Sequence, residues 1–196
     1  MPVNSSDATF FEHASKIMKQ ALSDINGEPT IDDIRGTIKY FKKYLSDEPL
    51  LPFEVLLIPS SYASHKIRAR FIAQGSETRP LIIFFPGTAF MHDMFDENYT
   101  VLSRMMKRID AHGLMLEYRL SPENPYPAPH EDASDALQYV LDKLEGLNID
   151  SHKIVISGHS SGANMAAVLC NALQHTTACM PSQYQTPSGV PLCRGL

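Results

Sequence analysis

The stretch that decides the fold is Ile154-Val155-Ile156-Ser157-Gly158-His159-Ser160-Ser161-Gly162-Ala163-Asn164-Met165. It begins as a β-branched run, passes through Gly-x-Ser-x-Gly and continues with helical composition. A strand that turns sharply into a helix needs small residues on both sides of the bend, and Gly158 and Gly162 supply them. The pattern predicts a nucleophile elbow that lifts Ser160 above the sheet edge. The alternative is a glycine-rich structural turn.

Two further segments favour the elbow. The run Arg79-Pro80-Leu81-Ile82-Ile83-Phe84-Phe85-Pro86-Gly87-Thr88-Ala89-Phe90 is typical of a buried strand that breaks into a small-residue loop,. Such a loop supplies the second oxyanion-hole donor beside a nucleophile elbow. The other segment is Glu117-Tyr118-Arg119-Leu120-Ser121-Pro122-Glu123-Asn124-Pro125-Tyr126-Pro127-Ala128-Pro129, which leads into a helical sequence.

Together the three segments resemble the hormone-sensitive-lipase-like branch of the α/β-hydrolases. The usual strings of that family run approximately HGGGF, DYRLAPEHPFPA and GDSAGGN, in this order. The similarity covers about residues 30 to 175, and the middle string is its most specific part. The resemblance implies an α/β-hydrolase fold, with a mostly parallel sheet flanked by helices. It also implies hydrolysis of carboxylic esters by a Ser-His-Asp triad, with neither a cofactor nor a metal ion.

The resemblance assigns the oxyanion hole to Gly87, Thr88, Ala89 and Ser161, through backbone N–H groups. Only Gly87 matches the family loop, because Pro86, Thr88 and Ala89 stand where the family has His, Gly and Gly. Thr88 and Ala89 still carry N–H groups, which is what an oxyanion hole requires. Each also carries a Cβ, so a positive φ there would cost about 1 kcal/mol.

The acyl part of a substrate is expected among the apolar residues that follow this loop, which are Phe90, Met91, Met94 and Phe95. A small apolar pocket suits short to medium acyl chains. Phe10 and Phe11 are weaker candidates for substrate contact, because N-terminal helices form part of a cap in the resembled family.

The general base and its acidic partner have no evident candidates. In α/β-hydrolases the triad follows the chain order Ser, Asp or Glu, His. No Asp or Glu follows Ser160, and the only later histidine is His175, about 22 Å along a continuous helix,. His159 adjoins the nucleophile but points elsewhere, and His92 is interpreted as a surface loop residue. Two triad members are therefore missing from the sequence.

Residues 176–196 contain three prolines, one charge and no regular periodicity. We interpret this tail as out of register with the family, which makes the fold incomplete at its C-terminus. A plain linker to a lost domain is the alternative for the tail, and a gene remnant without a stable fold is a third interpretation of the whole chain. An incomplete sheet would leave an open edge that promotes self-association, and the chain would be inactive.

The predicted organisation is an N-terminal helical cap over residues 1–50, an α/β-hydrolase core over 51–175 and an irregular tail over 176–196. Apolar spacing predicts a helix over 7–25, and Thr30 with Asp33 forms a capping-box variant that opens a second helix,. In the core we expect strands at 53–58, 67–72, 81–85, 114–117 and 154–157, and helices at 97–108 and 129–147. In the proline-rich connection, we expect Arg119 to pair with Glu123 or Asp132.

Composition excludes several other classes. The chain has 196 residues, a net charge of −5 and no basic stripe, which argues against a nucleic-acid partner,. No apolar stretch reaches the ~18 residues of a membrane helix, and the N-terminus lacks a signal-peptide pattern. Three cysteines without metal-ligand spacing indicate a cytoplasmic setting,. The predicted function is carboxylic-ester hydrolysis by Ser160, and the rival is a non-catalytic ligand-binding or interaction protein derived from the same fold.

Overall fold

The computed structural model describes residues 51–175, residues 27–36 and single positions between 12 and 25. The chain divides into two compact units, Met1–Asp47 and Glu48–Leu196, and each is described by itself. Phe10, Phe11, the tail 176–196 and much of the helix predicted over 7–25 lie outside the described residues.

In the first unit, helix α2 (Ile31–Gly36) begins where the capping box predicts. The Asp33 N–H donates to Thr30 Oγ1 at 3.2 Å, and the Thr30 N–H donates to Asp33 Oδ2 at 2.9 Å. These reciprocal bonds satisfy backbone donors that the first turn of a helix leaves free. The bonds from Thr30 also lower the pKa of Asp33.

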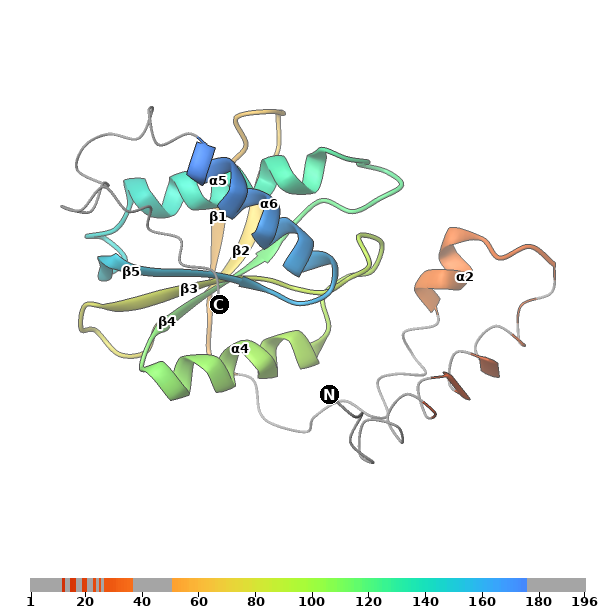
Figure 1. Ribbon diagram of the computed structural model, residues 1–196, viewed down its shortest axis with the longest axis horizontal. Coiled ribbons are helices and arrows are strands. Elements are labelled where there is room, and N and C mark those ends of the chain that lie inside the picture. Colours follow the sequence, from red (N-terminus) through yellow and green to blue (C-terminus); the bar gives the residue numbers. More distant parts are fainter. Residues whose placement is uncertain are drawn as a thin grey trace. The chain divides into compact units, whose positions relative to one another are not determined.

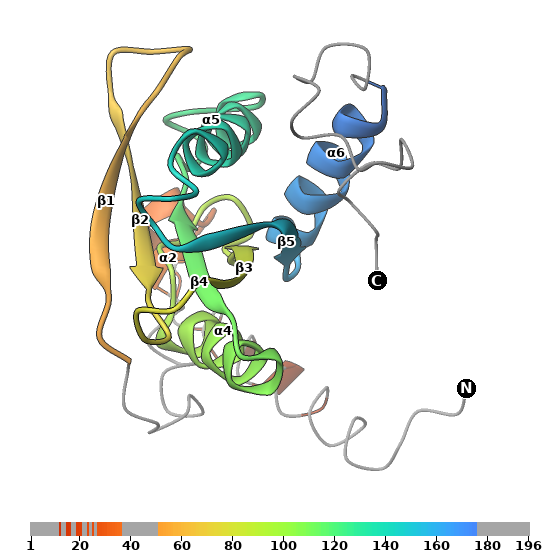
Figure 2. The ribbon, with the colours of Figure 1, turned by 90° about the vertical axis from the view of Figure 1, so that its left-hand side faces the viewer.

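The second unit is a five-stranded mixed sheet with helices on both faces (Figure 1). Its strand order is β1-β2-β4-β3-β5. The strands are β1 (Glu54–Pro59), β2 (Lys66–Ile72), β3 (Arg79–Phe85), β4 (His112–Glu117) and β5 (Ile149–Gly158), and the helices are α4 (Asp96–Ile109), α5 (Ala128–Asp142) and α6 (Ser161–His175). Figure 2 shows α4 on one side of the sheet and α5 and α6 on the other.

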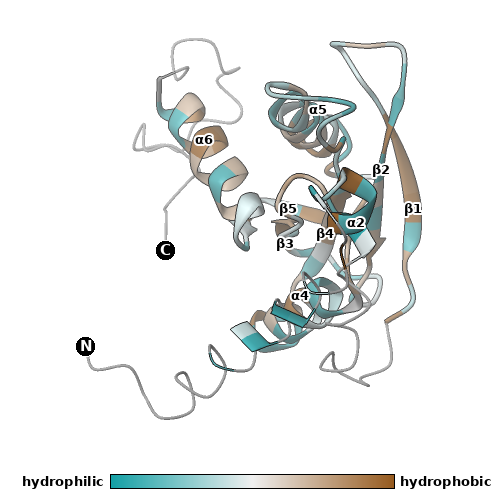
Figure 3. Cartoon of the chain, turned by 90° about the vertical axis from the view of Figure 1, so that its right-hand side faces the viewer, coloured by the Kyte–Doolittle hydropathy of each residue, from teal (hydrophilic) through white to brown (hydrophobic). Residues whose placement is uncertain are grey.

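Strand β3 is apolar and buried from Leu81 to Phe85 because both of its faces are covered there. Successive side chains of a strand point to opposite faces, so Leu81, Ile83 and Phe85 join the core beneath α5 and α6. Ile82 and Phe84 join a second core beneath α4. Figure 3 shows the hydrophobic colour on the central strands between these layers.

The described structure confirms the expected α/β-hydrolase fold, with differences in detail. Strands β3, β4 and β5 are parallel, whereas β2 is antiparallel to both of its neighbours, so the sheet is mixed rather than mostly parallel. Strand β5 starts five residues before the predicted Ile154, because its bulged N-terminal part extends the pairing to Arg79. Helix α5 ends at Asp142 rather than at 147.

Strand β5 pairs with β3 alone within the described part of the chain. Self-association through its other edge stays a prediction. Across the described residues, no helix combines the length and apolar character needed to cross a membrane.

Candidate active site

The register of the parallel strands brings the predicted loop and elbow together. Phe85, the last residue of β3, pairs with Gly158, the last residue of β5. The chain therefore leaves both strands at the same edge of the sheet, with the 86–90 loop beside the 159–161 turn. The His159 N–H donates to the Phe85 carbonyl at 3.2 Å and closes this junction.

The elbow glycines are required by close backbone packing. A Cβ at Gly162 would lie 1.9 Å from the carbonyl oxygen of Phe85, and a Cβ at Gly158 would lie 2.3 Å from the carbonyl oxygen of Gly162. Real Cβ atoms do not approach backbone atoms so closely. Strand β3, strand β5 and the start of α6 therefore meet at a point where no side chain fits.

Ser160 lies at the turn between β5 and α6 in a strained backbone conformation. Its φ is +53°, a left-handed value that is strained for a residue with a Cβ,. Its side chain is exposed, and its hydroxyl makes no hydrogen bond within the described part of the chain. The N-terminus of α6, whose first N–H groups have no partner in the helix and carry partial positive charge, lies directly after it,.

Gly87 brings the loop against this serine. A Cβ at Gly87 would lie 2.6 Å from His159 Nδ1, 2.8 Å from the His159 carbonyl oxygen and 3.1 Å from Ser160 Cβ. No larger residue fits between the loop and the elbow. On its other side the loop is held by Asn98, whose side-chain amide donates to the Gly87 carbonyl at 3.4 Å.

The amide of Thr88 is engaged in an internal hydrogen bond, and its predicted role as an oxyanion donor stays a prediction. It donates to Ser161 Oγ at 3.0 Å, and Thr88 is only 2% exposed. The amides of Ala89 and Ser161 make no hydrogen bond with another described group. The φ of Ala89 is +51° and that of the following Phe90 is +58°. Both residues have a Cβ, so these left-handed conformations strain the loop backbone.

Two cavities flank the loop. One, of about 340 Å³, is lined by Phe90, Ser121, Tyr126, Pro129, His130, Asn164 and Val168. The other, of about 190 Å³, is lined by Arg70, Pro86, Thr88, His92, Asp93, Met94, Leu116, Glu117, Tyr118 and Leu120. The predicted acyl-pocket residues are thus divided, because Phe90 faces the larger cavity, Met94 faces the smaller one, and Met91 and Phe95 line neither.

Comparison with known proteins places this geometry in a family. Residues 82–190 match the model of the alpha/beta hydrolase fold. The chain belongs to the α/β-hydrolase family. Its relatives include probable carboxylesterase 6 of Arabidopsis thaliana, 28% identical over 74% of this chain and 49% of that protein. Rabbit (Oryctolagus cuniculus) arylacetamide deacetylase is 28% identical over 70% of this chain and 36% of that one.

Solved α/β-hydrolase structures give the same result. A hyperthermophilic esterase from the archaeon Pyrobaculum calidifontis superimposes with a TM-score of 0.72 and 26% identity, over 90% of this chain and 55% of that one. The carboxylesterase EstE1 from a metagenomic library gives a TM-score of 0.66 and 26% identity, over 76% and 52%. The chain thus spans about half the length of these structures, and a third to a half of the two relatives above.

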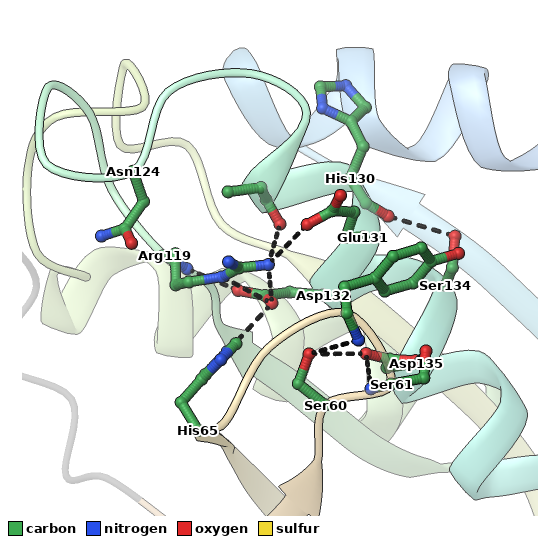
Figure 4. Close-up of polar contacts among 12 residues, drawn as sticks. Ser60, Ser61, His65, Arg119, Asn124, His130, Glu131, Asp132, Ser134 and Asp135 are labelled. Atoms are coloured by element: carbon green, nitrogen blue, oxygen red, sulfur yellow. Dashed lines mark hydrogen bonds and ion pairs between the residues drawn. The ribbon is translucent and has the colours of Figure 1, made fainter.

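In this α/β-hydrolase the connection after β4 is held by a charged network (Figure 4). The predicted pairing of Arg119 with Asp132 is confirmed, because the Arg119 N–H and Nε–H donate to the two carboxylate oxygens at 2.8 and 2.9 Å. Arg119 also donates to Glu131 at 2.9 Å, and His65 Nε2 lies 3.3 Å from Asp132 Oδ1. Partial burial opposes the charge of Arg119, but its bonds to Asp132 and Glu131 outweigh this and raise its pKa.

A separate set of hydrogen bonds, which the sequence did not reveal, also connects α5 to the β1–β2 turn. Asp135 accepts from the Ser61 N–H at 2.9 Å, from the Ser61 hydroxyl at 2.5 Å and from the Ser60 hydroxyl at 3.1 Å. The sequence signal for these bonds was the Pro59-Ser60-Ser61 turn, because serine hydroxyls in turns commonly form hydrogen bonds,. Its partner could not be predicted, because it lies 74 residues away.

Among the described residues, no histidine ring nitrogen forms a hydrogen bond with Ser160. His159 is exposed beside it, and His92 lines the smaller cavity with its ring 6.1 Å from that of Phe95. His175 is the last residue of α6, whereas Ser160 directly precedes the first residue of that helix. His130 was not among the residues predicted from the sequence. Its Nε2 lies 3.2 Å from Asn164 Oδ1, and its ring lies 5.9 Å from that of Phe90.

The described residues contain no cluster of three His, Cys, Asp or Glu side chains that could hold a metal ion.

Proposed function

We propose that this chain carries the nucleophile and oxyanion loop of a serine hydrolase that acts on carboxylic esters, with Ser160 as the nucleophile. The observation that carries the proposal is the adjacency of loop and elbow, because only 3.1 Å separates Ser160 Cβ from the position of a Cβ at Gly87. The exposed, strained Ser160 and the names of the related carboxylesterases and esterases support it.

In the proposed reaction Ser160 Oγ attacks the ester carbonyl carbon while its proton passes to a base. The carbonyl oxygen becomes an oxyanion, and the free amides of Ala89 and Ser161 donate to it. Collapse of the tetrahedral intermediate expels the alcohol, which takes up a proton, and leaves an acyl group on Ser160. A water molecule then attacks the acyl carbon, which releases the acid and returns the proton to Ser160. The scheme uses no cofactor.

The missing element is the base. A serine is a weak nucleophile until a base accepts its proton, and Ser160 has no such partner among the described residues. We therefore propose that the chain alone hydrolyses p-nitrophenyl acetate or butyrate negligibly, and that an external base restores acylation of Ser160. The cavities beside Phe90 and Met94, of about 340 and 190 Å³, suit short to medium acyl chains,.

Imidazole as the external base tests the proposal. The full chain is incubated with p-nitrophenyl butyrate and increasing imidazole, and the acylated peptide is identified by mass spectrometry. We expect an acyl group on Ser160, absent from Ser160→Ala and unchanged in Ser76→Ala, a matched control at an exposed loop serine. Equal acylation of the Ser160→Ala variant, or none on Ser160 at any imidazole concentration, would overturn the proposal.

A second candidate function is reversible binding of a small apolar ligand without catalysis. Two observations favour it: Ser160 lacks a described base, and the Thr88 amide is bound internally. Under this alternative the cavity beside Phe90, with its largely apolar lining, would be the binding site. Ester that binds reversibly with equal affinity to the intact chain and to Ser160→Ala, without an acyl adduct, would identify this function.

A further inference from the structure

Three hydroxyl groups form a buried network beneath the oxyanion loop. Tyr118, directly after β4, places its hydroxyl 2.7 Å from Thr88 Oγ1 and 3.2 Å from Ser161 Oγ. It also donates to the Pro86 carbonyl at 2.7 Å. These three residues, Tyr118, Thr88 and Ser161, are 5%, 2% and 8% exposed, so the network is buried. Side chains from β4, the loop and the start of α6 thus meet at one point.

The direction of each hydrogen bond in this network can be assigned. A carbonyl only accepts, so the single hydroxyl proton of Tyr118 goes to Pro86,. The Tyr118 oxygen therefore receives the hydroxyl protons of Thr88 and Ser161. Ser161 Oγ in turn accepts the Thr88 N–H at 3.0 Å. Burial raises the pKa of Tyr118, which keeps its hydroxyl protonated and this direction fixed.

The chain of bonds determines which amides face the substrate. With its N–H held by Ser161 Oγ, Thr88 cannot donate to an oxyanion. Ala89 and Ser161 retain amides without a described acceptor. A family member with Ala at position 161 has no hydroxyl there, so the amide at position 88 would have no such internal acceptor.

We propose that Ser161, held by Tyr118, is a positioning residue that withdraws the Thr88 amide from the oxyanion hole and leaves it with two donors, Ala89 and Ser161. This inference rests on the proposed function of Ser160. Removal of the Ser161 hydroxyl frees the Thr88 amide as a third donor. Because one oxyanion donor is worth about 10²–10³ in rate in other serine hydrolases, Ser161→Ala should react faster than the natural chain.

The first measurement is amide hydrogen exchange of the full chain, followed by NMR at Thr88. Ser161→Ala should raise the exchange rate of the Thr88 amide at least about tenfold, because the bond that protects it is lost. Ser161→Thr keeps a hydroxyl and should restore protection. Ser103→Ala is the matched control, since Ser103 is also a buried serine, 6% exposed, with no hydrogen bond from its hydroxyl to a described group. Unchanged exchange at Thr88 in Ser161→Ala would overturn the inference.

The second measurement is the rate of imidazole-assisted acylation of Ser160. Ser161→Ala should accelerate it by about tenfold or more, with Ser103→Ala close to the natural chain. An unchanged or slower rate would mean that the hydroxyl only supports the loop, and would overturn the inference. If Ser160 is acylated in no variant, the proposed function fails, whereas the Thr88 exchange rate still decides the hydrogen bond. If Ser161→Ala does not fold, Ser161→Cys replaces it in both measurements. Because sulfur is a weak acceptor, this variant should show smaller increases in Thr88 amide exchange and in the acylation rate.

Discussion

Tyr118 and Arg119 are neighbours in the chain, yet they enter two networks of opposite character. Tyr118 belongs to a neutral network of hydroxyls, amides and a carbonyl beside the elbow. Arg119 belongs to a charged network with Asp132 and Glu131 on α5. The side chains of successive residues in an extended segment point to opposite sides. These two neighbouring residues therefore contribute to both networks.

The two networks hold different parts of the molecule. The charged network holds the proline-rich connection against α5, and through His65 it also reaches the β1–β2 turn. It touches no part of the elbow. The neutral network binds the Thr88 amide beside Ser160. In the proposed reaction, a negative charge at this place would repel the developing oxyanion. Hydroxyl groups can direct an amide there without adding charge.

The largest effect on stability should come from a substitution at Gly162, whose backbone contact with Phe85 allows the neutral network to form. Gly162→Ala places a Cβ 1.9 Å from the Phe85 carbonyl oxygen, so the elbow must separate from β3 and Ser161 must move from Thr88. We expect a loss of about 3 kcal/mol in the free energy of unfolding, the upper end of the usual range for an overpacked site, measured by urea denaturation. Gly146→Ala is the matched control, because its new Cβ would be 3.7 Å from the nearest atom. Equal stability of the two variants would contradict the close packing.

Asp132→Asn tests the charged network and should have an intermediate effect. Asp132 is fully buried, and its loss of charge leaves Arg119 with Glu131 alone. Removal of one partner of a buried pair costs about 3–5 kcal/mol. Because Arg119 is 18% exposed and keeps one partner, we expect about 2 kcal/mol,. Asp142→Asn, at an exposed residue on the same helix, should change stability by less than about 0.5 kcal/mol. Thr88 amide exchange should be the same in both, and a large change would mean that the two networks are coupled.

The smallest expected effect on stability is a pH dependence that arises from Tyr118 of the neutral network. Burial raises the pKa of Tyr118 in the folded chain above its ordinary value of 10.0. The stabilisation by this protonated hydroxyl is therefore complete below pH 10 and is lost as the pH rises through the folded-state pKa.

The stability difference between the natural chain and Tyr118→Phe should consequently shrink above pH 10, by about 1 kcal/mol per unit of pKa difference. Thermal unfolding at several pH values measures it. Tyr126→Phe, at a ring that is 76% exposed, is the control. A constant difference from pH 8 to 11 would contradict the buried position of the Tyr118 hydroxyl.

The sequence alone predicts the parts of the site that depend on local chemistry. The β-branched run before Gly158 predicts strand β5, and the glycines on both sides of Ser160 predict a turn that the structure builds with a positive φ. Thr30 and Asp33 predict the start of α2 in the same way. These features depend on residues within a few positions of one another, so periodicity and turn chemistry reveal them.

The tertiary structure alone decides which distant groups meet. Thr88 and Ser161 are 73 residues apart, and they touch because β3 lies beside β5 with Phe85 opposite Gly158. Tyr118 joins them because β4 is the other neighbour of β3. Nothing in local periodicity specifies strand order. The sequence therefore names four candidate oxyanion residues, whereas the packing of three strands and one helix determines that the Thr88 amide bonds to Ser161 instead.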